Sequence, residues 1–384
     1  MPPFYLDIGY YQLNKKGEEL CGDTVEIMRG DNKTVVVLAD GLGSGVKANI
    51  LSRITAKTAA TMFKMGSSVD DVLATIAETL PICSVRKLAY STFSILEINN
   101  DGQAYLAEFD NPKAYLGKQS SLLYLKRGWR KIGDKEIAEV RFNLEEDNWV
   151  VLISDGVLHA GLGKVLNLGW GEKEVGKHIK ILAGQNYDAA DFAQELLKKV
   201  NNLYGGQPGD DVSVVVVKYR KLRTLTALVG PPRNPLDDRA AVGKLLAAGG
   251  KKVVCGGTTS KLVGRIMGKN VEVDLRSRSE VVPPTGLIEG IDLVTEGAIT
   301  LYYALQLLKQ GVKLHELAAA DDGASQLVAE FLKTDEIHFI VGLAINPTYQ
   351  YPGFPISCVM KNQTVRDMAE QLLALGKKVT IEYF

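Results

Sequence analysis

The sequence predicts an α+β protein with two domains, which we place at residues 1–220 and 221–384. Apolar, β-branched runs dominate the first region and surround a pair of helical patterns, which predicts a β-meander accompanied by helices. In the second region strand and helix patterns alternate, and this order favours a smaller α/β domain with a mainly parallel sheet. The basic segment Lys218–Arg223 separates the two patterns. A chain of 384 residues is long enough for two hydrophobic cores.

Bulk composition excludes several classes of protein. Hydrophobic residues make up 46% and charged residues 23% of the chain, as in ordinary globular proteins. The formal net charge is +0, so no basic field would attract nucleic acid or an anionic membrane. No apolar run is long enough to span a bilayer, and the N-terminus lacks the pattern of a signal peptide. We therefore expect a cytoplasmic protein whose widely spaced cysteines stay reduced: Cys21, Cys83, Cys255 and Cys358.

Three strand patterns open the first region and lead into two helices. The strand patterns cover Phe4–Leu13, Val25–Met28 and the run that begins at Thr34. Helical spacing follows over Val46–Met65 and Val69–Leu80. In the first helix the apolar residues expected to share one face are Ile50, Ile54, Ala56, Ala60 and Phe63.

A strand-rich block follows the helices. Ser91–Ile98 and Gln103–Phe109 flank an Asn-Asn-Asp-Gly turn, which is a strong hairpin signal. Asn148–Ile153 is a compact apolar strand, and Ala189–Asn202 has the periodicity of a helix. Weaker patterns predict three more strands and a glycine-rich loop: Tyr115–Leu116, Ser121–Leu125, Ala138–Phe142 and Gly161–Gly176.

The segment Thr34–Val46, TVVVLADGLGSGV, ends a buried strand with a carboxylate. A buried carboxylate is costly unless it is paired, so Asp40 is a candidate ligand at the edge of a sheet. The Gly41 carbonyl lies beside it, and such hard oxygens suit Mg²⁺ or Mn²⁺. Ser44 is expected to cap the helix that follows. The alternative is a strand–turn–helix corner with Asp40 in an Asx-turn.

Two further strands carry acidic residues at one end. Asp155 follows the strand pattern at residues 148–153, and Asp210 and Asp211 precede the apolar run Val212–Tyr219. If these ends converge with that of Asp40, the like charges repel one another strongly. Divalent cations with oxygen ligands would neutralise them, so the sequence predicts an acidic metal site.

Five short motifs occur in order: Cys-Gly-Asp-Thr around Asp23, Asp-Gly-Leu-Gly-Ser-Gly from Asp40, Asp-Asn-Pro from Asp110, Ser-Asp-Gly-Val around Asp155 and Gly-Asp-Asp-Val-Ser around Asp210. Together they closely resemble the SpoIIE-like branch of the PP2C (PPM) metal-dependent serine/threonine phosphatases, over about residues 4–219. The resemblance implies a β-sandwich of two antiparallel sheets flanked by helix pairs. It also implies hydrolysis of phosphoserine or phosphothreonine by a water that two divalent cations, Mn²⁺ or Mg²⁺, activate.

The resemblance assigns metal ligands by position. It implies that Asp40 bridges the two metals and that the Gly41 carbonyl ligates one of them. It implies that Asp155 and Asp210 hold the second metal. Asp23 matches the acidic position of the first motif, whose part as a direct ligand varies within the family.

Three neighbouring positions have other expected roles. Asp211 is expected to lie behind the ligands rather than to bind metal. Leu42 stands where many eukaryotic-type members have the histidine proposed to protonate the leaving oxygen, so a metal-polarised water is the expected proton source. His159 lies four residues after Asp155, and we expect it to have a surface or packing role.

The second domain contains a glycine- and hydroxyl-rich loop between the strand pattern Lys252–Cys255 and a helical pattern. Free N–H groups and hydroxyls at a helix N-terminus can bind an anion, so a small anionic ligand such as a phosphate-bearing metabolite is a candidate. The loop has neither the Walker A nor the G-x-G-x-x-G spacing, and a simply capped helix is the alternative. The loop residues are Gly256, Gly257, Thr258, Thr259 and Ser260.

The combined features predict a phosphoprotein phosphatase whose second domain senses a ligand or selects the partner. The resemblance implies a signalling phosphoprotein as substrate, of the kind represented by bacterial anti-sigma antagonist proteins. One alternative is a non-catalytic regulator that binds a phosphoprotein, although the presence of Asp40, Asp155 and Asp210 argues against it. The other is a metabolite-binding second domain with the phosphatase as its regulatory module.

Overall fold

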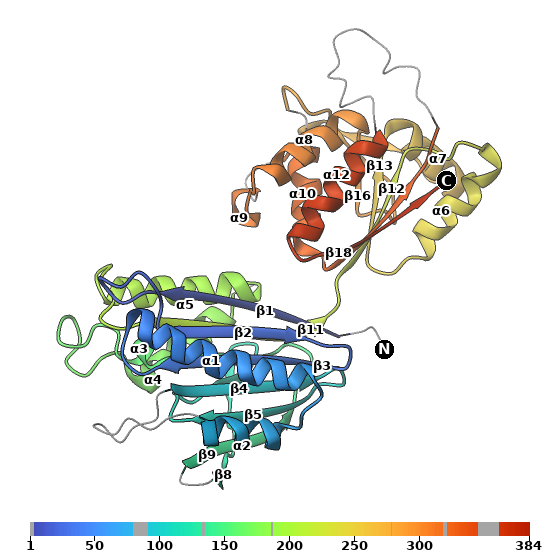
Figure 1. Ribbon diagram of the computed structural model, residues 1–384. Coiled ribbons are helices and arrows are strands. Elements are labelled where there is room, and N and C mark those ends of the chain that lie inside the picture. Colours follow the sequence, from blue (N-terminus) through green and yellow to red (C-terminus); the bar gives the residue numbers. More distant parts are fainter. Residues whose placement is uncertain are drawn as a thin grey trace. The chain divides into compact units, whose positions relative to one another are not determined.

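The computed structural model describes residues 4–79, 91–132, 135–185, 187–277, 279–317, 321–344 and 361–384. The chain divides into two compact units, Met1–Lys221 and Leu222–Phe384 (Figure 1). Each unit has its own sheets and its own hydrophobic core. Among the described helices, none combines the length and hydropathy needed to cross a membrane. Cys21 and Cys255 carry free thiols, whereas Cys83 and Cys358 lie outside the described residues.

A five-stranded antiparallel sheet joins the beginning and the end of the first unit. Its order is β1-β11-β10-β6-β7, and β1 pairs with β11 from Phe4 opposite Lys221 to Leu13 opposite Val212. The chain therefore starts and ends this unit on neighbouring strands. The bounds are β1 (Phe4–Leu13), β6 (Tyr115–Lys118), β7 (Ser121–Leu123), β10 (Asn148–Ile153) and β11 (Val212–Lys221).

A six-stranded antiparallel sheet forms the other half of the first unit, in the order β2-β3-β4-β5-β9-β8. Its second strand, β3, carries the run Val35–Ala39, in which every residue is fully buried. Both neighbours of β3 pair with it along its length, so its C-terminal end is fixed within the sheet. The bounds are β2 (Asp23–Arg29), β3 (Lys33–Gly41), β4 (Ser91–Asn99), β5 (Gln103–Phe109), β8 (Gly128–Ile132) and β9 (Lys135–Asn143).

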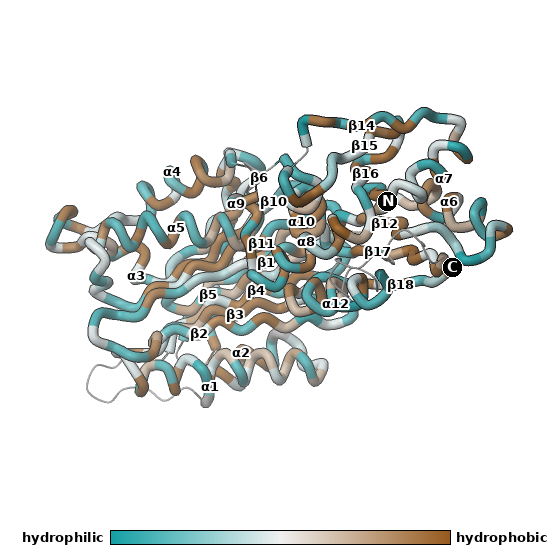
Figure 2. Tube along the Cα trace, turned by 90° about the horizontal axis from the view of Figure 1, so that it is seen from above, coloured by the Kyte–Doolittle hydropathy of each residue, from teal (hydrophilic) through white to brown (hydrophobic). Residues whose placement is uncertain are grey.

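The two sheets pack face to face. Leu38 and Leu96 of the six-stranded sheet share one buried cluster with Val150 and Val215 of the five-stranded sheet. Hydrophobic residues recur along these strands, as the brown segments of Figure 2 show. The predicted sandwich of two antiparallel sheets is confirmed.

A pair of helices covers the outer face of each sheet. Helices α1 (Gly45–Lys64) and α2 (Val69–Thr79) cover the six-stranded sheet, and they contribute Ala56, Ala59, Phe63, Val72, Leu73 and Ile76 to the buried cluster there. Helices α4 (Gly171–Ala183) and α5 (Ala189–Leu203) cover the five-stranded sheet in the same way (Figure 1). A single helical turn, α3 (Asp155–Leu158), follows β10.

Three local expectations were wrong. The side chains of Ile50 and Ile54 do not face the core, since they are 52% and 58% exposed. Ser44 precedes α1 but makes no capping bond, because its hydroxyl donates to Glu18 instead. The expected loop Gly161–Gly176 contains the first turns of α4, which begins at Gly171 because an amphipathic pattern overrides the glycines there.

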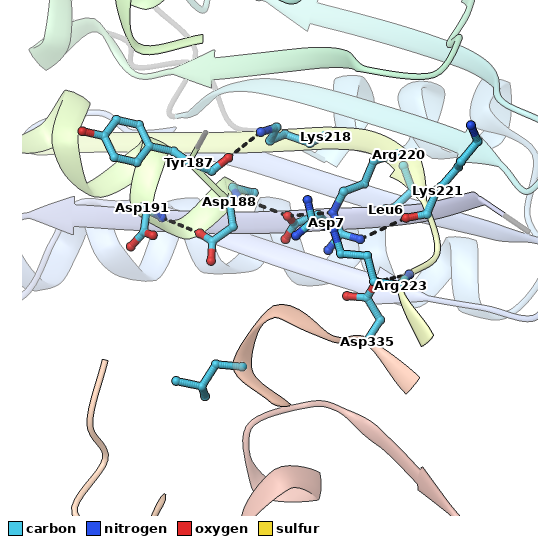
Figure 3. A network of polar contacts seen from close by, with 12 residues as sticks. Leu6, Asp7, Tyr187, Asp188, Asp191, Lys218, Arg220, Lys221, Arg223 and Asp335 are labelled. Carbon is cyan, nitrogen blue, oxygen red and sulfur yellow. Dashed lines mark hydrogen bonds and ion pairs between the residues drawn. The ribbon is translucent and has the colours of Figure 1, made fainter. Parts of the chain in front are cut away.

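Polar contacts hold α5 against the edge of the five-stranded sheet (Figure 3). The Asp7 carboxylate on β1 accepts from Arg220 Nε on β11 and from the Ala189 N–H at the start of α5, both at 3.3 Å. The Asp188 carboxylate caps α5 by accepting from the Asp191 N–H. These contacts fix the helix that lies behind the β10–β11 pair.

The second unit is built on one seven-stranded sheet in the order β14-β15-β16-β13-β12-β17-β18. Five of its strands are parallel, and their positions 3-2-1-4-5 follow the common doubly wound order. The predicted mainly parallel sheet is confirmed. The bounds are β12 (Thr224–Val229), β13 (Lys251–Cys255), β14 (Glu272–Asp274), β15 (Thr285–Leu287), β16 (Leu293–Thr295), β17 (Glu336–Val341) and β18 (Lys378–Tyr383).

Helices cover both faces of this sheet. Helices α6 (Asp238–Ala247) and α7 (Gly257–Met267) pack on one face. Helices α8 (Ala298–Lys309), α10 (Gly323–Lys333) and α12 (Lys361–Ala374) pack on the other. Each helix that follows a parallel strand therefore starts near the carboxyl edge of the sheet. The short elements are α9 (Leu314–Leu317), η1 (Pro235–Asp237) and η2 (Leu275–Ser277).

Candidate metal centre

Asp40 lies near the C-terminal end of β3, directly opposite Asp23 of β2 in the antiparallel register. The apolar run Val35–Ala39 drives β3 into the core, so the carboxylate comes at the point where the strand leaves the sheet. A Cβ on Gly41 would lie 2.0 Å from the Ala48 carbonyl oxygen, which no side chain tolerates. This glycine therefore lets α1 pack closely beside Asp40.

Asp155 and Asp210 reach the same place from the other sheet. Asp155 is the first residue of α3, after β10, and Asp210 lies in the turn before β11. A Cβ on Gly156 would lie 2.0 Å from the Asp211 carbonyl oxygen, so the two segments touch through their backbones. The glycines of these motifs thus bring the acidic strand ends together.

Two more carboxylates lie behind these three and are almost completely buried. Asp23 is 2% exposed and Asp211 is 4% exposed. One oxygen of each is held: Asp23 Oδ2 accepts from Ser213 Oγ at 2.7 Å, and Asp211 Oδ1 accepts from the Lys15 N–H at 2.9 Å. Among the described residues the other oxygen of each, Asp23 Oδ1 and Asp211 Oδ2, has no hydrogen-bond partner.

The electrostatics of this group favour a bound cation. Burial, followed by repulsion from the other four acids, raises the pKa of Asp40 to about 9. Burial likewise raises the pKa of Asp23 to about 7, although hydrogen bonds from Ser213 and Ser154 oppose the shift. Burial and then the Asp210 charge raise the pKa of Asp155. Without a cation Asp40 therefore holds a proton at neutral pH, and a positive ligand is needed to stabilise its charged form.

His159 lies beside two of these acids, and its exposed side chain agrees with the surface position expected for it. Single donor atoms of Asp155, His159 and Asp210 all lie within 4.8 Å of one another. His159 Nδ1 is 3.9 Å from Asp155 Oδ2, and both side chains are about half exposed. The four-residue spacing places both on one side of the α3 turn, and this spacing was the available sequence signal.

Several residues that sequence reasoning did not assign make hydrogen bonds around the acidic cluster. Ser213 links the sheets, since its hydroxyl donates to Asp23 and its N–H donates to Ser154 Oγ at 2.8 Å. Asn111 Nδ2 donates to Ser94 Oγ and to the Ile153 carbonyl, two residues before Asp155. Ser213 and Asn111 are uncharged, so a search of the sequence for acidic residues does not single them out.

Tyr204 supports the turn that carries Asp155. Its hydroxyl is buried and donates to the Gly156 carbonyl at 2.7 Å. Leu42, in the position that lacks a histidine, is only partly buried. The glycine–threonine loop at residues 256–260 lies in the other unit and is no part of this cluster.

A family model and a known relative both point to the same family. Residues 30–220 match the family model described as Stage II sporulation protein E (SpoIIE). Stage II sporulation protein E of Bacillus subtilis (strain 168) is 23% identical over 226 residues, which cover 56% of this chain and 26% of that protein. Phosphoserine phosphatase RsbX of the same organism is 49% identical over 39 residues, 10% of this chain and 20% of that protein. The matches therefore span about a quarter or less of these relatives.

A solved structure of RsbX in complex with magnesium resembles the chain with a TM-score of 0.41 and 19% identity. It covers 57% of this chain and 100% of that one.

Proposed function

Because residues 30–220 belong to the SpoIIE family of PP2C-type phosphatases, we propose that this unit hydrolyses phosphoserine or phosphothreonine in a signalling phosphoprotein. One observation carries the proposal: Asp40, Asp155 and Asp210 converge from three separate strand ends. Packing alone does not explain such a group, because each added carboxylate destabilises the others. A phosphatase of this family needs it, since the family depends on divalent metal.

The donor set fits two divalent cations. All five acids offer hard oxygen atoms, and the unpaired oxygens of Asp23 and Asp211 are buried acceptors without a partner among the described residues. We assign Asp40 as the shared ligand, with the Gly41 carbonyl beside it, and Asp155 and Asp210 as ligands of the second ion. Asp23 and Asp211 would stabilise the pair through their buried charge.

His159 makes Mn²⁺ the preferred ion of the proposed centre. The His159 imidazole beside Asp155 and Asp210 offers a nitrogen donor, and nitrogen is a poor ligand for Mg²⁺. Mn²⁺ accepts carboxylate oxygen and also binds imidazole more readily than Mg²⁺ does. The centre would therefore bind both ions, with Mn²⁺ the tighter.

Bound cations would supply a water activated at neutral pH and would neutralise the phosphoryl oxygens. The chain itself positions the reactants, which is the larger part of catalysis in phosphoryl transfer. Leu42 cannot donate a proton, so we assign protonation of the leaving serine oxygen to water. Lys15 Nζ lies 3.8 Å from Asp210 and is partly exposed, which places a positive charge where a substrate phosphate would approach.

The substrate class is carried over from the named relatives. RsbX is described as a phosphoserine phosphatase, and we propose the same phosphorylated side chain for this chain. A phosphorylated anti-sigma antagonist-like protein is the candidate partner. The second unit would then select that partner or report a ligand to the phosphatase.

Turnover of a phosphoserine peptide by the full chain tests the proposal. We expect hydrolysis with Mn²⁺, slower hydrolysis with Mg²⁺ and none after chelation, with activity restored by added metal. Turnover that survives chelation would contradict the metal-dependent mechanism. Tight binding of phosphoproteins without hydrolysis under any metal would favour the non-catalytic regulator instead.

A further inference from the structure

The carboxyl edge of the parallel sheet in the second unit is the place where doubly wound folds bind ligands. Strand β13 ends there at Cys255, and α7 begins two residues later at Gly257. The neighbouring strand β16 ends beside it, since the Gly256 N–H donates to the Thr295 carbonyl at 2.9 Å. The start of α7 is therefore anchored to the sheet on both sides of the turn.

The N-terminus of α7 has no cap. Gly256, the residue at the cap position, has φ +123° and contributes no side chain that could accept from the first turn. Among the described residues, the N–H groups of Gly257, Thr258 and Thr259 have no acceptor, whereas the Ser260 N–H donates to the Gly256 carbonyl. These three donors point out of the helix end together with its positive dipole.

Two other helices in this unit begin with an acidic acceptor. Asp322 accepts from the Ala324 and Ser325 N–H groups at the start of α10. Glu296 accepts from the Ile299 N–H at the start of α8. Helix α7, by contrast, begins without such an acceptor, and its first turn contains no acidic residue.

A buried hydroxyl gives a second, independent indication of a ligand. Thr259 is fully buried, and its Oγ1 has no hydrogen-bond partner in the described part of the chain. This oxygen lies 2.7 Å from the position a Cβ on Gly256 would take, so it is directed at the helix start. Buried hydroxyls without partners are uncommon, and an oxygen of a bound anion would satisfy this one.

The start of α7 is accessible to solvent, and its residues limit which donor groups could contact a ligand. Gly257 and Thr258 are exposed, and a Cβ on Gly257 would meet nothing within 4 Å. The Ser260 hydroxyl is unavailable because it donates to the Gly257 carbonyl at 2.9 Å. The donors that remain belong to Gly257, Thr258 and Thr259.

We propose that this helix start binds the phosphate group of a small metabolite. Three N–H groups, one hydroxyl and the helix dipole suit an oxyanion with several oxygens, and glycine lets it approach the backbone. Ser260 was among the residues predicted to bind an anion, and although its hydroxyl is unavailable, the proposed ligand is still an anion. This site is independent of the metal centre and needs no metal.

Inorganic phosphate, titrated calorimetrically into the full chain with chelator present, tests the proposal. The chelator removes metal-dependent phosphate binding in the first unit. The same titration of the Asp40→Asn variant is an independent control for binding at the metal centre. We expect one site with an affinity in the millimolar range or tighter. Absence of binding in that range would overturn the proposal.

The Gly257→Asp variant localises the site without endangering the fold. The new carboxylate has room, stabilises the helix start and occupies the donors, so phosphate affinity should fall by roughly tenfold or more. Gly243→Asp is the matched control, because Gly243 lies exposed on α6 with nothing within 4 Å of its Cβ position. Thr259→Val should weaken binding a few-fold through loss of the hydroxyl. Equal affinity in Gly257→Asp and Gly243→Asp would overturn the assignment.

Discussion

The two units place opposite charges at the point where a strand gives way to a helix. In the first unit, Asp40 is the last residue but one of β3, and four more carboxylates lie near it. In the second, β13 ends in Cys255, and free N–H groups of α7 follow. Both junctions use glycine for close approach, so glycine spacing alone does not say which charge will bind. The two junctions differ in the residue before the first glycine, which is the acidic Asp40 in the first unit and the uncharged Cys255 in the second.

The difference also predicts opposite responses to added or removed charge. Removing a carboxylate should stabilise the metal-free first unit, because its acids repel one another. Adding a carboxylate should stabilise the second unit at α7, because the helix dipole is uncompensated there. Each prediction below probes one side of this comparison.

The largest effect is expected for Asp40→Asn, which keeps the shape and removes the shared charge. Turnover of a phosphoserine peptide should fall by roughly a hundredfold or more. The unfolding temperature in chelator should rise, since repulsion at the end of β3 is relieved. Asp31→Asn is the control, because Asp31 is exposed at the opposite end of the same strand pair. Full activity of Asp40→Asn would exclude a bridging role.

His159→Gln separates the two candidate metals. Gln keeps an oxygen donor but removes the imidazole, so Mn²⁺ affinity should fall by about tenfold and Mg²⁺ affinity by less. Calorimetric titration of each metal gives both constants. In the wild-type chain, the Mn²⁺ electron spin echo signal should show coupling to a ligand nitrogen. A nitrogen coupling that persists in His159→Gln would exclude this histidine as the donor.

The pH dependence of stability should have an unusual sign in the absence of metal. The pKa values of Asp40 and Asp23 are raised to about 9 and about 7, so the folded state binds more protons than the unfolded state. Their contribution is therefore complete below the unfolded values near pH 4 and is lost as pH rises toward 9. Urea unfolding in chelator should show stability falling by a few kcal/mol between about pH 5.5 and 8.5. Saturating Mn²⁺ should remove the slope, and a flat profile in chelator would contradict the raised pKa values.

The smallest effect is the stability gain of Gly257→Asp. Replacing glycine in a helix and adding an acid to its first turn should each contribute, to about 1 kcal/mol in total. Gly243→Asp gains only from loss of glycine, so the difference between the two variants reports the dipole. A gain that is no larger at residue 257 than at residue 243 would mean that the α7 start is already neutralised.

The meeting of acidic residues at the strand ends could be predicted from the sequence because a carboxylate at the end of an apolar strand is a local signal. Asp40, Asp155 and Asp210 each stand beside such a run. The depth of Asp23 and the partners of Ser213 were not predictable, because they depend on how two sheets meet.

The outward face of α1 shows why helix orientation could not be read from periodicity. Ala48, Ala56 and Ala59 face the sheet, whereas Ile50 points to solvent. Near Gly41, where α1 packs closely on β3, the buried helix residue Ala48 is small, whereas Phe63 is buried near the other end of the helix. A rule that sends every large apolar residue inward therefore fails for Ile50 and Ile54, although it holds for Phe63.

Anomalous diffraction from crystals grown with Mn²⁺ tests the central claim most directly. The account predicts two adjacent peaks, about 3.5–4 Å apart, with the Asp40 carboxylate between them and Asp155 and Asp210 on the second. Asp40→Asn crystals, grown in the same way, should lose at least one peak. Mn²⁺ bound elsewhere in the unit, with no peak in contact with Asp40, would contradict the account.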